Sequence, residues 1–151
     1  MRGWAPLRQA RIAEAVIASA AVVLGGLIYV SYGSKSLLVF RWVSFLGCRS
    51  DCMALRQFAR TRLGVHHDWI LYNLPDGLWV FAGVLSLGLL WAGRTGVESW
   101  LWRLSPLVIA ATAEFGQGLH IVPGTFDWLD MTAYVVGAAS AFLILAWRSR
   151  L

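Results

Sequence analysis

The sequence predicts an all-α membrane protein with four transmembrane helices and an interfacial amphipathic helical segment between the first two. Of its 151 residues, 58% are hydrophobic and only 14% are charged, whereas a typical soluble domain carries about 25% charged residues. The apolar residues fall in blocks of membrane-spanning length rather than in amphipathic stripes. Most of the nine tryptophans stand near the ends of these blocks, where an aromatic belt meets the two membrane interfaces. We expect a single membrane domain over residues 1–151.

The first predicted span covers residues 12–30 and follows a short basic segment. Its length, and the lack of a small-residue cleavage site after it, favour a retained helix over a cleaved signal peptide. Arg8 and Arg11 precede this span and two arginines end the chain, so the positive-inside rule predicts that both termini are cytoplasmic. Glu14, one turn into the helix, is expected to pair with Arg11 or to reach the interface.

Residues 31–72 form one long connection, which we expect at the outer face. It is too often interrupted by arginine to span, and interfacial amphipathic helices suit it better. Its basic residues number six and argue against an outer position, although long loops count less than short ones in the positive-inside rule. They are Lys35, Arg41, Arg49, Arg56, Arg60 and Arg62.

The same connection holds Cys48 and Cys52, which are near enough on a helix or across a turn to form a disulfide. An oxidising compartment would favour that bridge, and two free thiols are the alternative. The segment His66-His67-Asp68 is interpreted as a polar loop. Because these spacings match no zinc pattern, no metal site is predicted. We also expect no cofactor.

The remaining three spans are predicted at residues 74–91, 101–121 and 129–147. Asn73 suits the N-cap of the second span, and Asp76 follows in its first turn, near the positive end of the helix dipole. Gly83 and Gly88 in the second span, and the small residues 137–140 in the fourth, would allow neighbouring helices to approach closely.

Polar residues gather where these three spans reach one face of the membrane. If both termini are inside, the start of the second span, the end of the third and the start of the fourth all lie outside. The residues that converge there are Asp76, Glu114, Gln117, His120, Asp127 and Asp130, with Tyr134 one turn further into the fourth span. Ionisable residues inside membrane segments are costly and indicate a functional site. The structural alternative is that Glu114 and Gln117 bond across helices while Asp127 and Asp130 cap a helix.

This last pattern resembles the VanZ-like family of small bacterial membrane proteins. The resemblance covers roughly residues 73–147 and rests on Glu114, Gln117, the turn Pro123-Gly124, Asp127, Asp130 and Gly137. Thr125 stands where the family usually has an arginine, and Tyr134 stands where it usually has an asparagine. The resemblance implies a multi-pass protein of the bacterial cytoplasmic membrane, from a family whose founding member is linked to resistance to the glycopeptide antibiotic teicoplanin. It implies no settled biochemical activity.

The leading hypothesis is a non-enzymatic protein that handles an envelope lipid or a lipid-linked cell-wall precursor at its outer face. Grouped carboxylates beside a histidine can bind a cation or a hydroxyl-rich head group. Glu114, Gln117, Asp127 and Asp130 would make those contacts. Nucleic acid is not an expected partner, because the arginines flank hydrophobic blocks, where topology and lipid head groups require them.

Two alternatives remain open. The first is an intramembrane enzyme acting on a lipid or glycan, with Glu114 or Asp127 as general base and His120 as acid or metal ligand. No nucleophile motif or phosphate-binding loop supports it. The second is a small structural subunit of a membrane complex, or a homo-oligomer, that packs through Gly83, Gly88 and the small residues of the fourth span.

Overall fold

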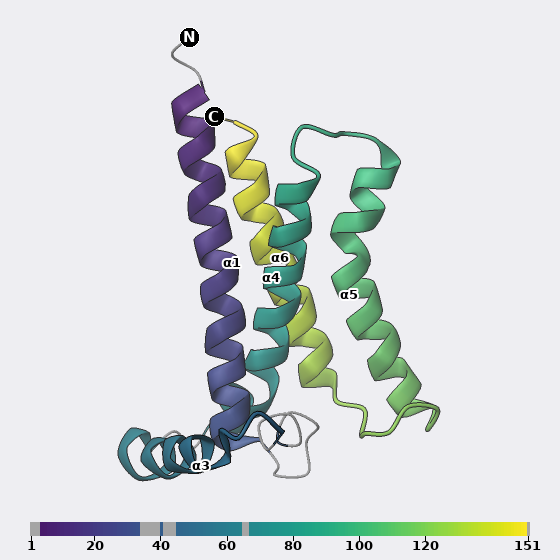
Figure 1. Cartoon of the computed structure of the whole chain (residues 1–151). Helices are drawn as coiled ribbons and strands as arrows, with labels where there is room; N and C mark the ends of the chain where they lie inside the picture. The colour runs from purple at the N-terminus through teal and green to yellow at the C-terminus, as the bar shows by residue number, and fades with distance from the viewer. Residues whose placement is uncertain (1–3, 34–39, 41–44, 65–66, 151) are drawn as a thin grey trace.

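The computed structural model describes residues 4–33, 40, 45–64 and 67–150, and these residues form helices joined by turns, without a strand. Four long helices run side by side (Figure 1): α1 (Trp4–Tyr32), α4 (Leu74–Leu90), α5 (Val97–Gly118) and α6 (Trp128–Arg148). The start of α1 and the end of α6 lie at the same end of this bundle. The cytoplasmic location of both termini stays a prediction. Lys35, Arg41 and His66 lie outside the described residues.

Three helical segments are long and apolar enough to cross a membrane: Leu7–Tyr32, Trp69–Leu90 and Trp128–Arg148. The all-helical prediction is therefore confirmed, and three of the four expected spans have the length and composition that a crossing needs. The remaining helix, α5, corresponds to the third predicted span. It is 22 residues long, but Arg103 and Glu114 within it lower its hydropathy. A membrane crossing by α5 stays a prediction.

The central helix is α4, which contacts α1, α5 and α6. Its closest approach is to α6, where a Cβ atom on Gly137 would collide with the carbonyl oxygen of Gly77. A Cβ atom on Gly77 would likewise stand 2.9 Å from the carbonyl oxygen of Ala133. Small residues thus let two backbones touch, as is typical of helices that pack within membranes. Buried Val84, Leu85 and neighbouring alanines fill the rest of this core.

The interior proline of α5, Pro106, packs against α4. Its ring carbons stand 3.0 Å from the position that a Cβ atom on Gly83 would occupy, so this glycine makes room for the ring. Because proline has no N–H, the carbonyl oxygen of Trp102 loses its helical partner. The Ser105 hydroxyl donates to that oxygen at 2.8 Å, which satisfies the freed acceptor and keeps α5 continuous.

The expected amphipathic segment between the first two spans forms α3 (Arg49–Phe58), which continues into the π-helical turn η1 (Ala59–Leu63). α3 lies across the end of the bundle opposite the termini (Figure 1). Its Arg56 is only 4% exposed and donates to the carbonyl oxygens of Val30 at 2.5 Å and Gly33 at 2.9 Å. Burial lowers the pKa of the Arg56 guanidinium, yet arginine stays charged in proteins, so a cation caps the negative end of α1.

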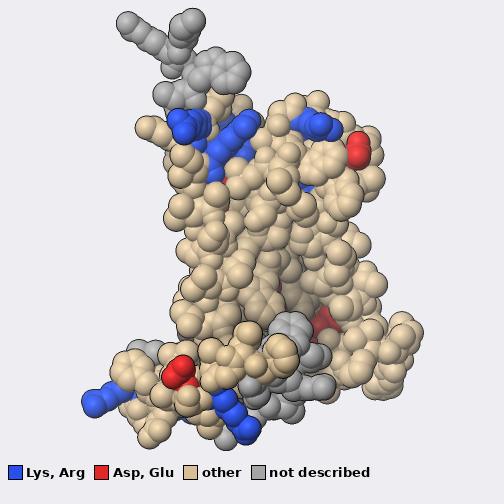
Figure 2. Space-filling view, viewed as in Figure 1, with Lys and Arg blue, Asp and Glu red and all other residues tan. Residues whose placement is uncertain are grey.

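On the face drawn in Figure 2, the Lys and Arg side chains lie at the two ends of the bundle, and the surface between them is almost free of charged side chains. Large aliphatic side chains such as Val23, Ile109 and Leu143 are more than half exposed. Soluble monomers rarely expose continuous apolar surface on this scale. The arrangement fits a protein whose middle is covered by lipid.

Candidate functional site

The start of α4, the end of α5 and the start of α6 meet at the end of the bundle opposite the termini (Figure 1). This meeting point holds four carboxylates: Asp76, Glu114, Asp127 and Asp130, which we call the carboxylate cluster. A π-helical turn, η2 (Trp69–Asn73), leads directly into α4. The convergence expected from topology therefore occurs for these four side chains.

Asn73 joins two of the four carboxylates. Its side-chain amide donates to Oδ1 of Asp130 at 2.7 Å and to Oδ2 of Asp127 at 3.4 Å. The sequence predicted Asn73 as a helix cap, but its side chain makes no capping hydrogen bond. Asn73 is instead a buried bridge from the start of α4 to the start of α6, with 3% of its surface exposed. That role depends on a partner more than fifty residues away, which no local pattern predicts.

Glu114 ties the end of α5 to the start of α6. It is 2% exposed, and its Oε1 accepts a hydrogen bond from the backbone N–H of Asp127 at 2.5 Å. Asp127 is the N-cap of α6, since its side chain accepts from the backbone N–H of Leu129 at 2.8 Å. Tyr134, 8% exposed, also interacts with the Glu114 carboxylate. Glu114 thus bonds across helices and Asp127 caps a helix, as the structural alternative raised by the sequence had it.

Asp76 differs from the other three carboxylates. It is partly buried in the first turn of α4, and it lies close enough to Asp130 and Glu114 for electrostatic repulsion between the carboxylates. The phenols of Tyr29 and Tyr134 lie near it. Within the described part of the chain its carboxylate receives no hydrogen bond, and no lysine or arginine forms an ion pair with any member of the cluster. Carboxylates in such surroundings require a proton or an external partner.

Gln117 and His120 stand apart from the cluster. The Gln117 side chain packs against Gly124, whose φ of 140° and lack of a Cβ atom allow this contact. His120 takes the left-handed conformation with φ 58° in the turn that follows α5, and its side chain is exposed. This turn ends α5 at Gly118, three residues before the predicted end of the third span. The motif residue Gln117 therefore shapes the turn that carries Asp127 to Glu114.

The other candidates from the sequence lie elsewhere. Cys48 and Cys52 bracket the start of α3 as separate thiols, so the disulfide stays a prediction. His67 and Asp68 are exposed before η2. No group of three or more histidine, cysteine or acidic side chains in the described ranges is arranged to hold a metal ion.

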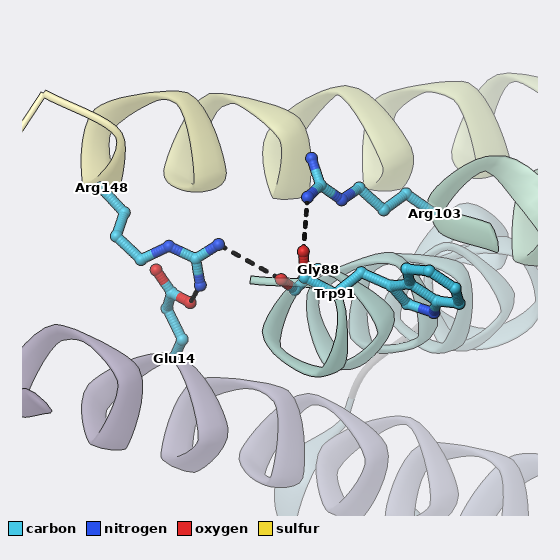
Figure 3. A network of polar contacts seen from close by, with 5 residues as sticks. All are labelled: Glu14, Gly88, Trp91, Arg103 and Arg148. Atoms are coloured by element: carbon cyan, nitrogen blue, oxygen red, sulfur yellow. Dashed lines mark hydrogen bonds and ion pairs between the residues drawn. The ribbon is translucent and has the colours of Figure 1, made fainter. Parts of the chain in front are cut away.

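A second polar network lies at the opposite end, near the termini (Figure 3). Arg148 at the end of α6 pairs with Glu14 of α1 at 2.5 Å and donates to the carbonyl oxygen of Gly88 at 3.2 Å. Glu14 was expected to pair with Arg11 or to reach the interface, but its carboxylate is buried against a residue 134 positions away. Arg103 of α5 donates to the carbonyl oxygen of Trp91 at 3.0 Å. From the sequence, these arginines were expected only to serve topology and lipid head groups.

Comparison with protein-family models, with curated proteins and with solved structures found no match for this chain. The resemblance to the VanZ-like family accordingly stays a prediction that rests on the residues quoted for it.

Proposed function

We propose that this chain is a VanZ-like, four-span protein of the bacterial cytoplasmic membrane. In this proposal it binds the polar head group of an envelope lipid or lipid-linked cell-wall precursor at its outer face. The observation that carries the proposal is the carboxylate cluster: four acidic residues from three helices meet at one end of the bundle, and no arginine or lysine of the described residues pairs with them. Such a site attracts a cation or a group rich in hydrogen-bond donors.

The hydrogen bonds divide the cluster into two pairs with different tasks. Glu114 and Asp127 are occupied, because one accepts from a backbone N–H between helices and the other caps α6. Asp76 and Asp130 keep acceptor capacity, since a carboxylate can accept about four hydrogen bonds and Asp130 accepts one from Asn73. Of the predicted ligand-binding residues, we therefore infer that Asp76, Asp130 and the nearby Tyr134 make the contacts, and that Glu114 and Asp127 do not.

The chemistry of the ligand follows from this arrangement. Two partly buried carboxylates without a cationic partner in the described chain favour an ammonium group or several hydroxyl groups, which donate hydrogen bonds and offset negative charge. Amine-bearing phospholipids and the sugar portion of lipid-linked precursors both present such donors. A phosphate group alone would be repelled by the same carboxylates.

The placement of the arginines along the chain is the argument for an outer position of the site. The end of the bundle where α1 starts and α6 ends carries Arg8, Arg11, Arg148 and Arg150 close to the spans. The opposite end carries Arg49, Arg56, Arg60 and Arg62, but these belong to the long connection, and long loops count less in the positive-inside rule. The carboxylate cluster lies at this opposite end. This placement assumes that α5 crosses the bilayer with the other three long helices.

The test is native mass spectrometry of lipids that co-purify with the full-length protein in mild detergent. We expect one amine- or sugar-bearing lipid on the wild type and its loss from Asp76→Asn/Asp130→Asn, which keeps both side-chain shapes. The matched control is Asp51→Asn, because Asp51 is an exposed acid on α3, and it should retain the lipid. Identical bulk phospholipids on all three proteins would refute the proposal.

A further inference from the structure

A cleft of about 970 Å³ opens at the end of the bundle that carries the termini, far from the carboxylate cluster. Four arginines line it: Arg11 of α1, Arg94 of the turn after α4, Arg103 of α5 and Arg148 of α6. We call it the arginine cleft. Its volume lies at the upper end of the range typical of small-molecule sites, which is about 300–1,000 Å³.

The positive charge of the arginine cleft is compensated only in part. Glu14 pairs with Arg148, and no other acidic side chain in the described part of the chain forms an ion pair with any of the four. Nη2 of Arg103 donates to the carbonyl oxygens of Trp91 and Arg94, while the buried Nε of the same side chain has no hydrogen-bond partner among the described residues. Four guanidiniums against one carboxylate leave the cleft ready for an anion.

The tryptophans of this end hold two of the guanidiniums in place. The guanidinium of Arg94 lies 5.2 Å from the ring centre of Trp91, and that of Arg103 lies 5.8 Å from the ring centre of Trp100. Trp91 also stacks on Trp102 at 6.2 Å between ring centres. Cation–π contacts of this kind restrict the guanidinium while leaving its N–H donors available at the edges.

One wall of the arginine cleft is apolar. It includes Ala139, Phe142, Leu143 and Ala146. They stand at positions i, i+3, i+4 and i+7 and so share one face of α6. From Ala139 to Arg148 the helix rises by about 14 Å. The cleft is therefore apolar toward the middle of the bundle and basic at the end of the bundle. A phospholipid changes in the same order, from its acyl chain to its phosphate.

We propose that the arginine cleft binds an anionic phospholipid, with its phosphate against Arg94 and Arg103 and one acyl chain along α6. Arginine matches phosphate in charge and in its forked donor geometry. Basic pockets between transmembrane helices on the cytoplasmic side bind anionic head groups in this way. A zwitterionic lipid fits less well, because its ammonium group would approach the same arginines. The proposal requires the bundle to lie in a bilayer, but it does not depend on any ligand of the carboxylate cluster.

The experiment is a binding titration by native mass spectrometry on the delipidated full-length protein. The probes are phosphatidylglycerol, phosphatidylcholine with the same acyl chains, and inorganic phosphate. We expect the wild type to bind phosphatidylglycerol about tenfold or more tightly than phosphatidylcholine, and to retain no inorganic phosphate. Arg94→Gln/Arg103→Gln should remove this preference, while Arg62→Gln, at the opposite end, should keep it.

A second variant separates loss of binding from loss of folding. Ala146→Trp fills the apolar wall and leaves every guanidinium in place, so it should weaken phosphatidylglycerol binding while circular dichroism stays that of the wild type. Equal binding of both lipids by the wild type would overturn the proposal, and so would tight binding by Ala146→Trp or retention of inorganic phosphate. Asp76→Asn/Asp130→Asn should bind phosphatidylglycerol normally, so the two proposals can fail separately.

Discussion

Removing the charge of Glu14 should destabilise the helix bundle strongly, although this residue lies far from the carboxylate cluster. Its carboxylate pairs with Arg148 at 2.5 Å, and the side chains are 5% and 12% exposed respectively. The pair joins α1 to α6, the first and last helices of the bundle. Arg148 also donates to the carbonyl oxygen of Gly88, so one guanidinium holds three helices together (Figure 3).

The size of the effect follows from the cost of an unpaired buried charge. Taking away one partner of a buried ion pair costs about 3–5 kcal/mol, because the remaining ion keeps its desolvation penalty. Glu14→Gln keeps an acceptor for Arg148, so we expect the lower end of that range, about 3 kcal/mol. Arg148→Gln also removes the Gly88 hydrogen bond and should cost more. In Glu14→Gln/Arg148→Gln the losses should fall short of additivity by up to about 3 kcal/mol.

The assay is reversible unfolding in mixed detergent micelles, followed by far-ultraviolet circular dichroism for the wild type, both single variants and the double variant. Glu98→Gln is the control, since Glu98 is exposed in the first turn of α5 and should cost no more than about 1 kcal/mol. If Glu14→Gln costs no more than this control, or if the two single losses simply add, the buried pair does not hold the bundle as argued.

Three further predictions concern other contacts of the described residues, each measured by unfolding in detergent. Arg56→Ala should free two carbonyl oxygens at the end of α1 and lose two hydrogen bonds worth roughly 1.5–3 kcal/mol each, and an unchanged midpoint would refute the capping role. Gly137→Val should cost about 1–3 kcal/mol through overpacking against α4, whereas Gly26→Ala, whose Cβ atom would meet nothing within 4 Å, should be tolerated. Glu114→Ala should cost about 1–3 kcal/mol by leaving the backbone N–H of Asp127 without an acceptor, and Glu114→Gln should cost less because its amide oxygen can replace that acceptor.

The sequence by itself determined the helical class and the approximate positions of the long helices. Apolar blocks of spanning length, broken by Pro, Gly and Arg, require little tertiary information to interpret, because backbone groups in lipid must be satisfied within helices. The α4 helix at Leu74–Leu90 ends one residue before the predicted span, and the α6 helix at Trp128–Arg148 is one residue longer than predicted at each end. The sequence predicted four crossings, and three of the four helices have the length and hydropathy for one, because α5 carries more polar residues than the others.

The meeting of the carboxylates also followed from the sequence, because an up-and-down order of helices brings alternate helix ends to one face. Their individual tasks did not. Asp127 was expected among the caps, and it is one, whereas Asn73 was expected to cap and instead bridges α4 to α6. A hydrogen bond between residues distant in sequence depends on how two helices are rotated against each other.

Only the tertiary structure decided which arginines act on the bundle and which merely flank it. Arg56, Arg103 and Arg148 look like ordinary boundary charges in the sequence, yet each donates to carbonyl oxygens at the end of another helix. The physical reason is that helix ends leave carbonyl groups without partners, and a long guanidinium can reach them only once the neighbouring helix is in place. The arginine cleft is a product of the same packing.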